Sequence, residues 1–205
     1  MNVLLINGSP HKEGCTFTAL RTVADTLESE GISTEIVHIG TKDIRGCIAC
    51  YKCREIGRCI FDDLVNELVP KFDAADGLVI GSPVYFAGPN GSLTNLLDRL
   101  FFSSSVSRRM KVGAAVCSAR RAGTTATFDR LNKYFTISEM PIVSSRYWNM
   151  VHGSCREEAL QDSEGIQSMR ILGRNMAFLI RAIAAERAAN GLPEQEEITY
   201  TNFIR

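Results

Sequence analysis

Four of the seven cysteines lie in one short stretch of the chain. Cys47, Cys50 and Cys53 are each separated by two residues, and Cys59 follows after five more. Thiolates with these spacings can surround an iron-sulfur cube within one tight loop. Zinc is less favoured, because zinc sites usually combine two separated ligand pairs and no histidine lies nearby. The spacing therefore indicates a metal cluster first, with free or reversibly oxidised thiols, or zinc, as the alternatives.

Basic side chains accompany these cysteines. Positive charge partly offsets the negative charge of clustered thiolates and so favours any metal cluster. The basic residues are Arg45, Lys52, Arg54 and Arg58. Outside the stretch, Cys117 ends an apolar run and is interpreted as a small buried hydrophobic residue. No site is assigned to it or to the isolated Cys155.

A phosphate site is predicted after the first apolar run, residues 3–6. The loop that follows opens directly into a helical pattern. A helix N-terminus offers unpaired amides and the positive end of the helix dipole, which suit a phosphate. The loop lacks both the Gly-Lys-Ser/Thr ending of a Walker A loop and a Gly-x-Gly-x-x-Gly pattern, so those nucleotide sites are excluded. An ordinary capped turn is the alternative, and the candidate ligands are Ser9, His11, Lys12, Gly14 and Thr16.

Two later loops, residues 81–88 and 118–123, also follow apolar runs. In a doubly wound sheet, ligands bind in a crevice at the carboxyl ends of the strands. The first loop would supply a flat apolar wall, with core packing as the alternative for its aromatic side chains, and the second would close the far side. A flat, phosphorylated ring system suits this arrangement. The candidate residues are Pro83, Val84, Tyr85, Phe86, Ser118, Arg120 and Gly123.

Apolar runs and helical patterns alternate along the chain. Short runs buried on both faces are typical of parallel strands, and the patterns between them predict helices on both faces of the sheet. The predicted strands span residues 3–6, 34–39, 78–80, 112–116 and about 141–147. The predicted helices span 16–30, a segment beginning near 62 or 63, 93–100, 124–135 and 165–189. This alternation predicts an α/β fold with a doubly wound sheet of five parallel strands and a cysteine-rich insertion after the second.

Length and charge limit the class of protein. The 205 residues predict a single domain over 1–205, with the insertion at about 46–61 and a C-terminal arm at about 191–205. Lys+Arg and Asp+Glu both number 23, so no net charge steers the chain toward nucleic acid or a membrane surface. The N-terminus lacks the pattern of a signal peptide or membrane span. We expect a cytoplasmic protein, in which clustered cysteines do not form a disulfide framework.

Three short motifs resemble those of the flavodoxin-like NAD(P)H-dependent FMN reductases over roughly residues 2–150. They are Gly8-Ser9-Pro10, Gly14-Cys15-Thr16 and Ser82-Pro83-Val84-Tyr85. The resemblance implies a flavodoxin-like sheet order and FMN, with its phosphate on Ser9 and on the amides and hydroxyl around Cys15 and Thr16. It also implies that the isoalloxazine lies over residues 83–86. Cys15 departs from the pattern, since relatives commonly carry a polar amide or hydroxyl residue there.

The cysteine spacing resembles the compact motif of the iron-sulfur flavoproteins, a branch of the same fold in which four such cysteines ligate a [4Fe-4S] cluster. The resemblance implies a homodimer or homotetramer. The resulting expectation is an FMN-dependent oxidoreductase that passes electrons from NAD(P)H through flavin, with or without the cluster, to a quinone, flavin or protein acceptor. The alternatives are a non-enzymatic electron carrier and a redox-sensing FMN-binding protein. No catalytic residue is named, because hydride transfer to flavin needs no protein acid or base at that step.

Overall fold

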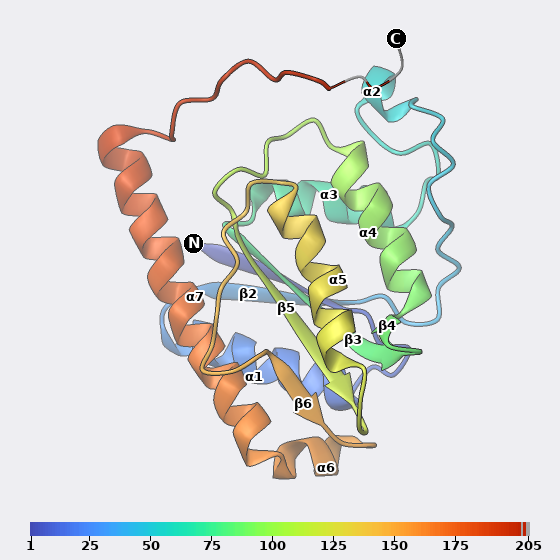
Figure 1. The fold of residues 1–205 in the computed structure, drawn as a ribbon, viewed down its shortest axis with the longest axis vertical. Coiled ribbons are helices and arrows are strands. Elements are labelled where there is room, and N and C mark those ends of the chain that lie inside the picture. The colour runs from blue at the N-terminus through green and yellow to red at the C-terminus, as the bar shows by residue number, and fades with distance from the viewer. Residues whose placement is uncertain (202, 204–205) are drawn as a thin grey trace.

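A parallel sheet forms the centre of the computed structural model, which describes residues 1–201 and 203 (Figure 1). Its strands are β1 (Asn2–Asn7), β2 (Ser33–His38), β3 (Gly77–Tyr85), β5 (Val112–Ala119) and β6 (Met150–His152). They pair in parallel in the order β2-β1-β3-β5-β6, and β4 (Gly88–Pro89) forms an antiparallel hairpin with the end of β3. The predicted doubly wound sheet of five parallel strands is confirmed.

Helices cover both faces of the sheet, as predicted. Apolar residues of α1 (Cys15–Ser29) and α7 (Ser163–Asn190) form the core on one face. Those of α3 (Leu64–Ala74), α4 (Gly91–Ser103) and α5 (Thr124–Thr136) form the core on the other. The α1 and α7 backbones approach closely at Gly173, where a Cβ would lie 2.7 Å from Cβ of Thr26. Two short helices, α2 (Cys53–Ile56) and α6 (Arg156–Gln161), complete the set.

The predicted helix start near residues 62 and 63 is confirmed by its cap. The carboxylate of Asp63 accepts a hydrogen bond from the amide of Val65 at 3.1 Å, which satisfies one of the free donors at the start of α3. The side chain of Asn90 caps α4 in the same way, accepting from Ser92 and Leu93. The two caps fix the first residues of α3 and α4, which follow the cysteine-rich insertion and the β3–β4 hairpin.

The prediction of a strand at about 141–147 is wrong. Pro141 has no N–H, and residues 141–143 share only a single bridge with β5, between Gly113 and Ile142. The amide side chain of Asn149 then donates to the carbonyl oxygen of Ala115 at 3.0 Å, in place of a backbone partner. The fifth strand, β6, begins only at Met150, at the end of this segment.

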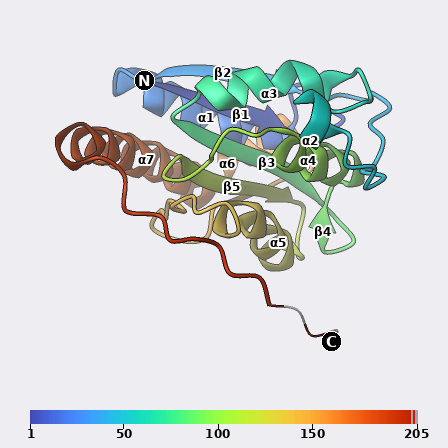
Figure 2. The same ribbon diagram turned by 90° about the horizontal axis from the view of Figure 1, so that it is seen from above.

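The insertion and the arm occupy the predicted stretches of sequence. Between β2 and α3, residues 39–63 are all described and contain one regular element, α2. The described residues 191–201 form no helix or strand, and in Figure 1 this segment crosses above the other elements from the end of α7 toward the side of α2. In Figure 2 it lies outside the helix layers. The single-domain organisation stays a prediction. Among the described residues, no helix has both the length and the apolarity needed to cross a membrane.

Candidate functional site

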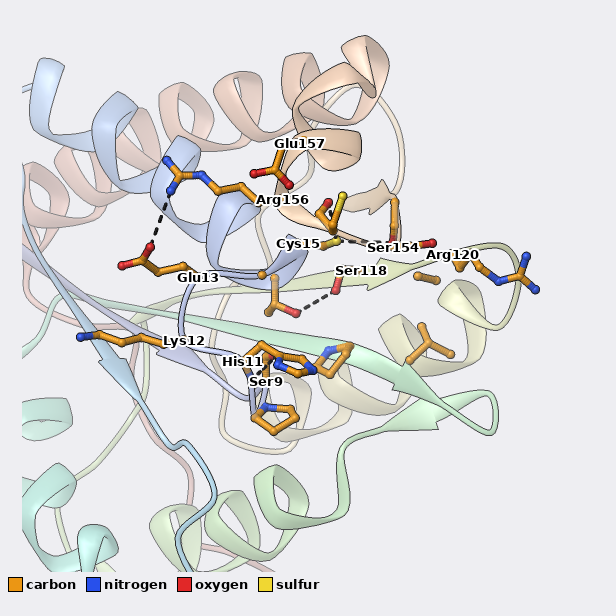
Figure 3. A pocket seen from close by; sticks show the side chains of 18 residues that line it. Ser9, His11, Lys12, Glu13, Cys15, Ser118, Arg120, Ser154, Arg156 and Glu157 are labelled. Atoms are coloured by element: carbon orange, nitrogen blue, oxygen red, sulfur yellow. Dashed lines mark hydrogen bonds and ion pairs between the residues drawn. The ribbon is translucent and has the colours of Figure 1, made fainter.

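A cavity opens at the carboxyl ends of β1, β3 and β5, beside the start of α1 (Figure 3). In a doubly wound sheet this is where the crossover connections diverge to opposite faces and leave a crevice. Most of the predicted ligand residues line it, although they come from three separate segments: the loop and start of α1, the end of β3 and the end of β5. They are Ser9, His11, Lys12, Gly14, Cys15, Thr16, Pro83, Val84, Ser118 and Arg120.

The start of α1 faces this cavity without a side-chain cap. Its N-cap residue is Gly14, which has no side chain to pair with the first amides of the helix. Next along the helix, the hydroxyl oxygens of Thr16 and Ser118 lie 2.7 Å apart and join α1 to the end of β5. Free amides, hydroxyl donors and the positive end of a 15-residue helix together make a site for an anion.

Asn7, the last residue of β1, holds the loop before α1 in shape. Its side-chain oxygen accepts from the amide of Ser9 at 3.1 Å, and its side-chain nitrogen donates to the carbonyl of Lys12 at 3.2 Å. Gly8 is required next to it, because a Cβ there would lie 2.8 Å from the carbonyl oxygen of Gly81. Sequence reasoning did not select Asn7, although a polar residue directly after the apolar run 3–6 was the available signal. In the structure Asn7 is fully buried, and its hydrogen bonds satisfy it there.

Tyr85, Phe86 and Gly123, three predicted ligand residues, lie outside the lining of the cavity. Phe86 is fully exposed at the turn between β3 and β4, with a left-handed backbone at φ 50°. Gly123, also left-handed at φ 91°, lies against Val84 and Ala87 of the hairpin. The contribution of these three residues to a flavin site stays a prediction.

One wall of the cavity was missed from the sequence, namely residues 153–157 after β6. Arg156 belongs to this wall, and its Nη1 lies 3.7 Å from Oε2 of Glu13 beside the first turn of α1 (Figure 3). The signal was present in the apolar pair Met150 and Val151 followed by Gly153, which is the pattern of a strand end. Placing the fifth strand too early concealed it.

The thiol of Cys15 ties α1 to this wall. It donates to the carbonyl oxygens of Cys155 at 3.1 Å and Gly153 at 3.4 Å. Burial raises the pKa of the Cys15 thiol, and the nearby Cys155 and acidic side chains raise it further. Cys15 therefore remains a protonated donor at neutral pH.

The four clustered cysteines line a second, smaller cavity, together with apolar side chains and Arg99. Ala49 and Tyr51, on either side of Cys50, both adopt left-handed backbone (φ 50° and 58°), which bends the loop around the cavity. All four thiols are free. In the part of the chain that is described, no three potential ligand side chains converge as closely as a bound metal requires. A cluster would draw the exposed thiols of Cys47 and Cys50 inward.

Arg99, which sequence reasoning did not select, donates hydrogen bonds to one of these sulfurs. Its side chain is 1% exposed, and its Nε and Nη2 donate to Sγ of Cys59 at 3.3 and 3.2 Å. Nη1 and Nη2 also form a two-pronged pair with Asp63 at 2.6 and 2.9 Å. The remaining partners are loop carbonyls, those of Arg45 and Phe61. Arg99 thus joins both ends of the cysteine loop to α4.

The basic residues that were predicted to balance thiolate charge have other partners. Lys52 pairs with Glu55 at 2.9 Å and Arg58 with Asp62 at 3.2 Å, on the surface. Arg54 stacks on the ring of Tyr51, 4.9 Å from its centroid. The cation that donates to Cys59 comes instead from a mostly apolar helix, where it stands out beside Leu96, Leu97 and Leu100.

Comparison with known proteins shows the family of the chain. The profile of the NADPH-dependent FMN reductase family matches residues 1–154. The chain belongs to this family. It is accordingly an NAD(P)H-dependent FMN oxidoreductase, as the three motifs predicted. Within the family it belongs with the iron-sulfur flavoproteins: it is 33% identical over 191 residues to one from Methanocaldococcus jannaschii, a match that covers 89% of this chain and 99% of the relative.

Solved structures confirm the flavodoxin-like fold of this FMN reductase family member. RosB, solved with a bound formylriboflavin phosphate intermediate, superposes with a TM-score of 0.72 at 16% identity, covering 99% of this chain and 92% of RosB. A flavodoxin from the domain Archaea gives a TM-score of 0.60 at 13% identity, covering 88% of this chain and 99% of the flavodoxin. At these identities the likeness concerns the fold alone.

Proposed function

We propose that FMN binds in the cavity at the start of α1 and passes electrons from NAD(P)H to a [4Fe-4S] cluster held by Cys47, Cys50, Cys53 and Cys59. A quinone, a flavin or a protein would be the final acceptor. The observation that carries the flavin assignment is the uncapped N-terminus of α1, which opens into a cavity at the carboxyl ends of the strands.

The cavity residues would bind and orient the flavin rather than supply its chemistry. FMN, when bound, accepts hydride and releases electrons. The hydroxyls of Ser9 and Thr16 and the first amides of α1 would hold the phosphate, with His11 and Lys12 beside them. Pro83 and Val84 would give an apolar wall for the ring system, and Arg120 would add positive charge. None of these side chains is assigned a proton transfer.

The cysteine cavity fits a cluster through its donors and its surroundings. Four free thiols from one loop face a pocket with apolar walls, and Arg99 donates two N–H groups to the sulfur of Cys59. Hydrogen bonds to sulfur ligands and a low-polarity shell tune clusters of this kind. The name of the Methanocaldococcus relative, an iron-sulfur flavoprotein, supports the same assignment.

An anaerobic preparation tests both cofactors at once. The protein is expressed with ample iron and sulfide, its absorption spectrum is recorded, and iron, sulfide and FMN are measured per chain. We expect about one FMN and about four iron atoms per chain, and bleaching of the flavin bands by NADH or NADPH. Flavin bands with no iron or sulfide would reject the cluster and leave the flavin assignment intact.

Replacement of Thr16 by Val should weaken FMN much more than riboflavin. The variant loses one hydroxyl donor to a charged phosphate, a contribution of about 1.5–3 kcal/mol, or about tenfold or more in affinity. Isothermal titration of the flavin-free protein with each ligand measures the difference. Thr22→Val is the matched control, because Thr22 lies farther along α1 and its hydroxyl donates to the carbonyl of Thr18. Equal losses for FMN and riboflavin would place the phosphate elsewhere.

We also propose a homodimer or homotetramer in the cytoplasm. Several large apolar side chains are exposed on this chain, including Phe86 at the hairpin and Phe178, 69% exposed, on α7. The free cysteines suit a reducing compartment. Light scattering of the flavin-loaded protein at micromolar concentration should give at least twice the 22.6 kDa of the chain. A monomer under these conditions would contradict the oligomer.

A further inference from the structure

Two cysteines outside the clustered four meet at the wall of the flavin cavity. Cys15 is the first residue of α1, and Cys155 is the N-cap of α6. Both line the cavity, and Sγ of Cys15 lies 3.1 Å from the carbonyl oxygen of Cys155. The proposed electron path uses neither thiol.

The loop that carries Cys155 is held against α1 by more than this contact. Gly153 allows the loop to pass close to α6, since a Cβ there would lie 2.7 Å from the amide nitrogen of Ala159. Arg156 lies near Glu13, beside the first turn of α1. Cys155 itself is exposed, whereas Cys15 is partly buried behind it. The thiol of Cys155 is therefore open to a small oxidant, and Sγ of Cys15 lies beside the backbone of the same residue.

We propose that Cys15 and Cys155 form a dithiol site that a hydroperoxide oxidises to a disulfide across the wall of the flavin cavity. The thiolate of Cys155 attacks one peroxide oxygen, the O–O bond breaks, and a sulfenic acid forms with release of hydroxide. The sulfur of Cys15 then attacks the sulfenic sulfur, and the S–O bond breaks as the S–S bond forms. The proton that Cys155 lost joins the released hydroxide as the first water, and the sulfenic hydroxyl leaves with the proton of Cys15 as the second. Two thiols and one hydrogen peroxide thus give one disulfide and two waters.

Cys15 and Cys155 already lie at neighbouring positions in the cavity wall. A disulfide requires Cα atoms within about 7 Å and suitably directed Cβ atoms. Sγ of Cys15 already lies against the carbonyl oxygen of Cys155, so the disulfide requires the two side chains to turn toward each other. The new bond replaces the single S–H donor that Cys15 shares between the carbonyl oxygens of Gly153 and Cys155. A dithiol reductant reverses it by exchange.

The disulfide would alter the site where the phosphate is proposed to bind. It draws residue 155 toward the first turn of α1, so the oxidised form should bind FMN about tenfold more weakly or worse. A bound FMN should in turn slow oxidation, because it occupies the cavity that both thiols line. The effect on FMN binding rests on the proposed function, whereas formation of the disulfide does not depend on it.

The test starts from protein from which FMN and iron have been removed. This protein is treated with one equivalent of hydrogen peroxide in the presence of a chelator. Free thiols are then blocked, and the protein is digested with trypsin without reductant. The chain offers a clean readout, because peptides 13–21 and 147–156 each contain a single cysteine. We expect a linked 13–21/147–156 species that lacks two hydrogens and disappears on reduction. In the Cys15→Ser variant, Cys155 should accumulate a sulfenic acid that dimedone traps. In the Cys155→Ser variant, Cys15 should remain unoxidised.

Cys117→Ser is the matched control and should leave the linked species unchanged. Its thiol is fully buried, and burial raises the pKa of Cys117 to about 12, so it takes no part. Recovery of both peptides as blocked thiols, over-oxidation of Cys155 without a link, or a link from Cys155 to any other cysteine would overturn the dithiol site. A linked protein with unchanged FMN affinity would overturn only the coupling to flavin. Absence of FMN binding in the reduced protein would instead reject the proposed function.

Discussion

Replacement of any one of Cys47, Cys50, Cys53 or Cys59 by Ser is expected to remove most of the bound iron and to leave FMN affinity nearly unchanged. A serine hydroxyl is a poor substitute for a thiolate ligand, and a cubane with three protein ligands is readily lost. FMN affinity should survive because none of the four residues lines the cavity at the start of α1. The cysteine cavity is instead lined in part by residues near the C-terminal end of α4.

Iron and sulfide analysis of anaerobically purified variants, together with fluorescence titration of FMN, measures the two outcomes separately. Cys117→Ser provides the control, since this buried strand residue should affect neither cofactor. Four Ser variants that keep the full iron content would reject the ligand assignment. If wild-type protein prepared in the same way contains no iron and the variants keep full NAD(P)H-driven turnover, the loop has a structural or thiol-redox role, and the oxidoreductase activity is unaffected.

Replacement of Arg99 by Leu is expected to lower both the free energy of unfolding and the amount of bound iron. The substitution leaves the carboxylate of Asp63 without its two-pronged partner and frees the sulfur of Cys59 and the carbonyls of Arg45 and Phe61. Breaking a buried ion pair by removing one partner costs about 3–5 kcal/mol. Because the side chain of Asp63 is 25% exposed, the lower end of about 3 kcal/mol is expected.

Urea unfolding of the iron-free protein measures this loss without any contribution from a cluster. Arg58→Leu is the matched control, because its pair with Asp62 lies on the surface of the same loop and is worth less than about 1 kcal/mol. Arg99→Lys keeps the charge and loses the planar fork, so its stability should fall between those of Arg99→Leu and the wild type. Similar midpoints for Arg99→Leu and Arg58→Leu would show that Arg99 does not hold the cysteine loop.

The pair formed by Arg99 and Cys59 illustrates why part of the site could not be read from the chain. These residues are separated by 40 positions, and the only local signal was a charge on a helix face rich in leucine. The basic residues adjacent to the cysteines were the natural choice for balancing charge. In the structure, two of them pair with neighbouring carboxylates instead, since a carboxylate three or four positions away on a short helix or turn is the nearest partner.

The fifth strand shows the same limit in the fold. Residues 141–147 include apolar and β-branched positions, which favoured a strand there. In the structure, this segment forms only a single β-bridge with β5, at Ile142. The side-chain amide of Asn149 donates to the carbonyl oxygen of Ala115 in β5. The short strand Met150–His152 lies beyond these residues, so the loop that follows it, and with it Cys155 and Arg156, was absent from the predicted site.

What the sequence alone determined was the order of the elements, the motif-bearing loops and the clustered cysteines. Each of these depends on neighbours in the chain: apolar runs specify buried strands, helical periodicity specifies the covering helices, and two-residue spacers bring thiols into one loop. Only the tertiary structure decided which side chains meet. It placed Arg99 against Cys59, Cys15 against the carbonyl of Cys155, and the tip of the β3–β4 hairpin outside the cavity lining. The two contacts join residues 40 and 140 positions apart, and they form only when the packed sheet and helices bring those segments together.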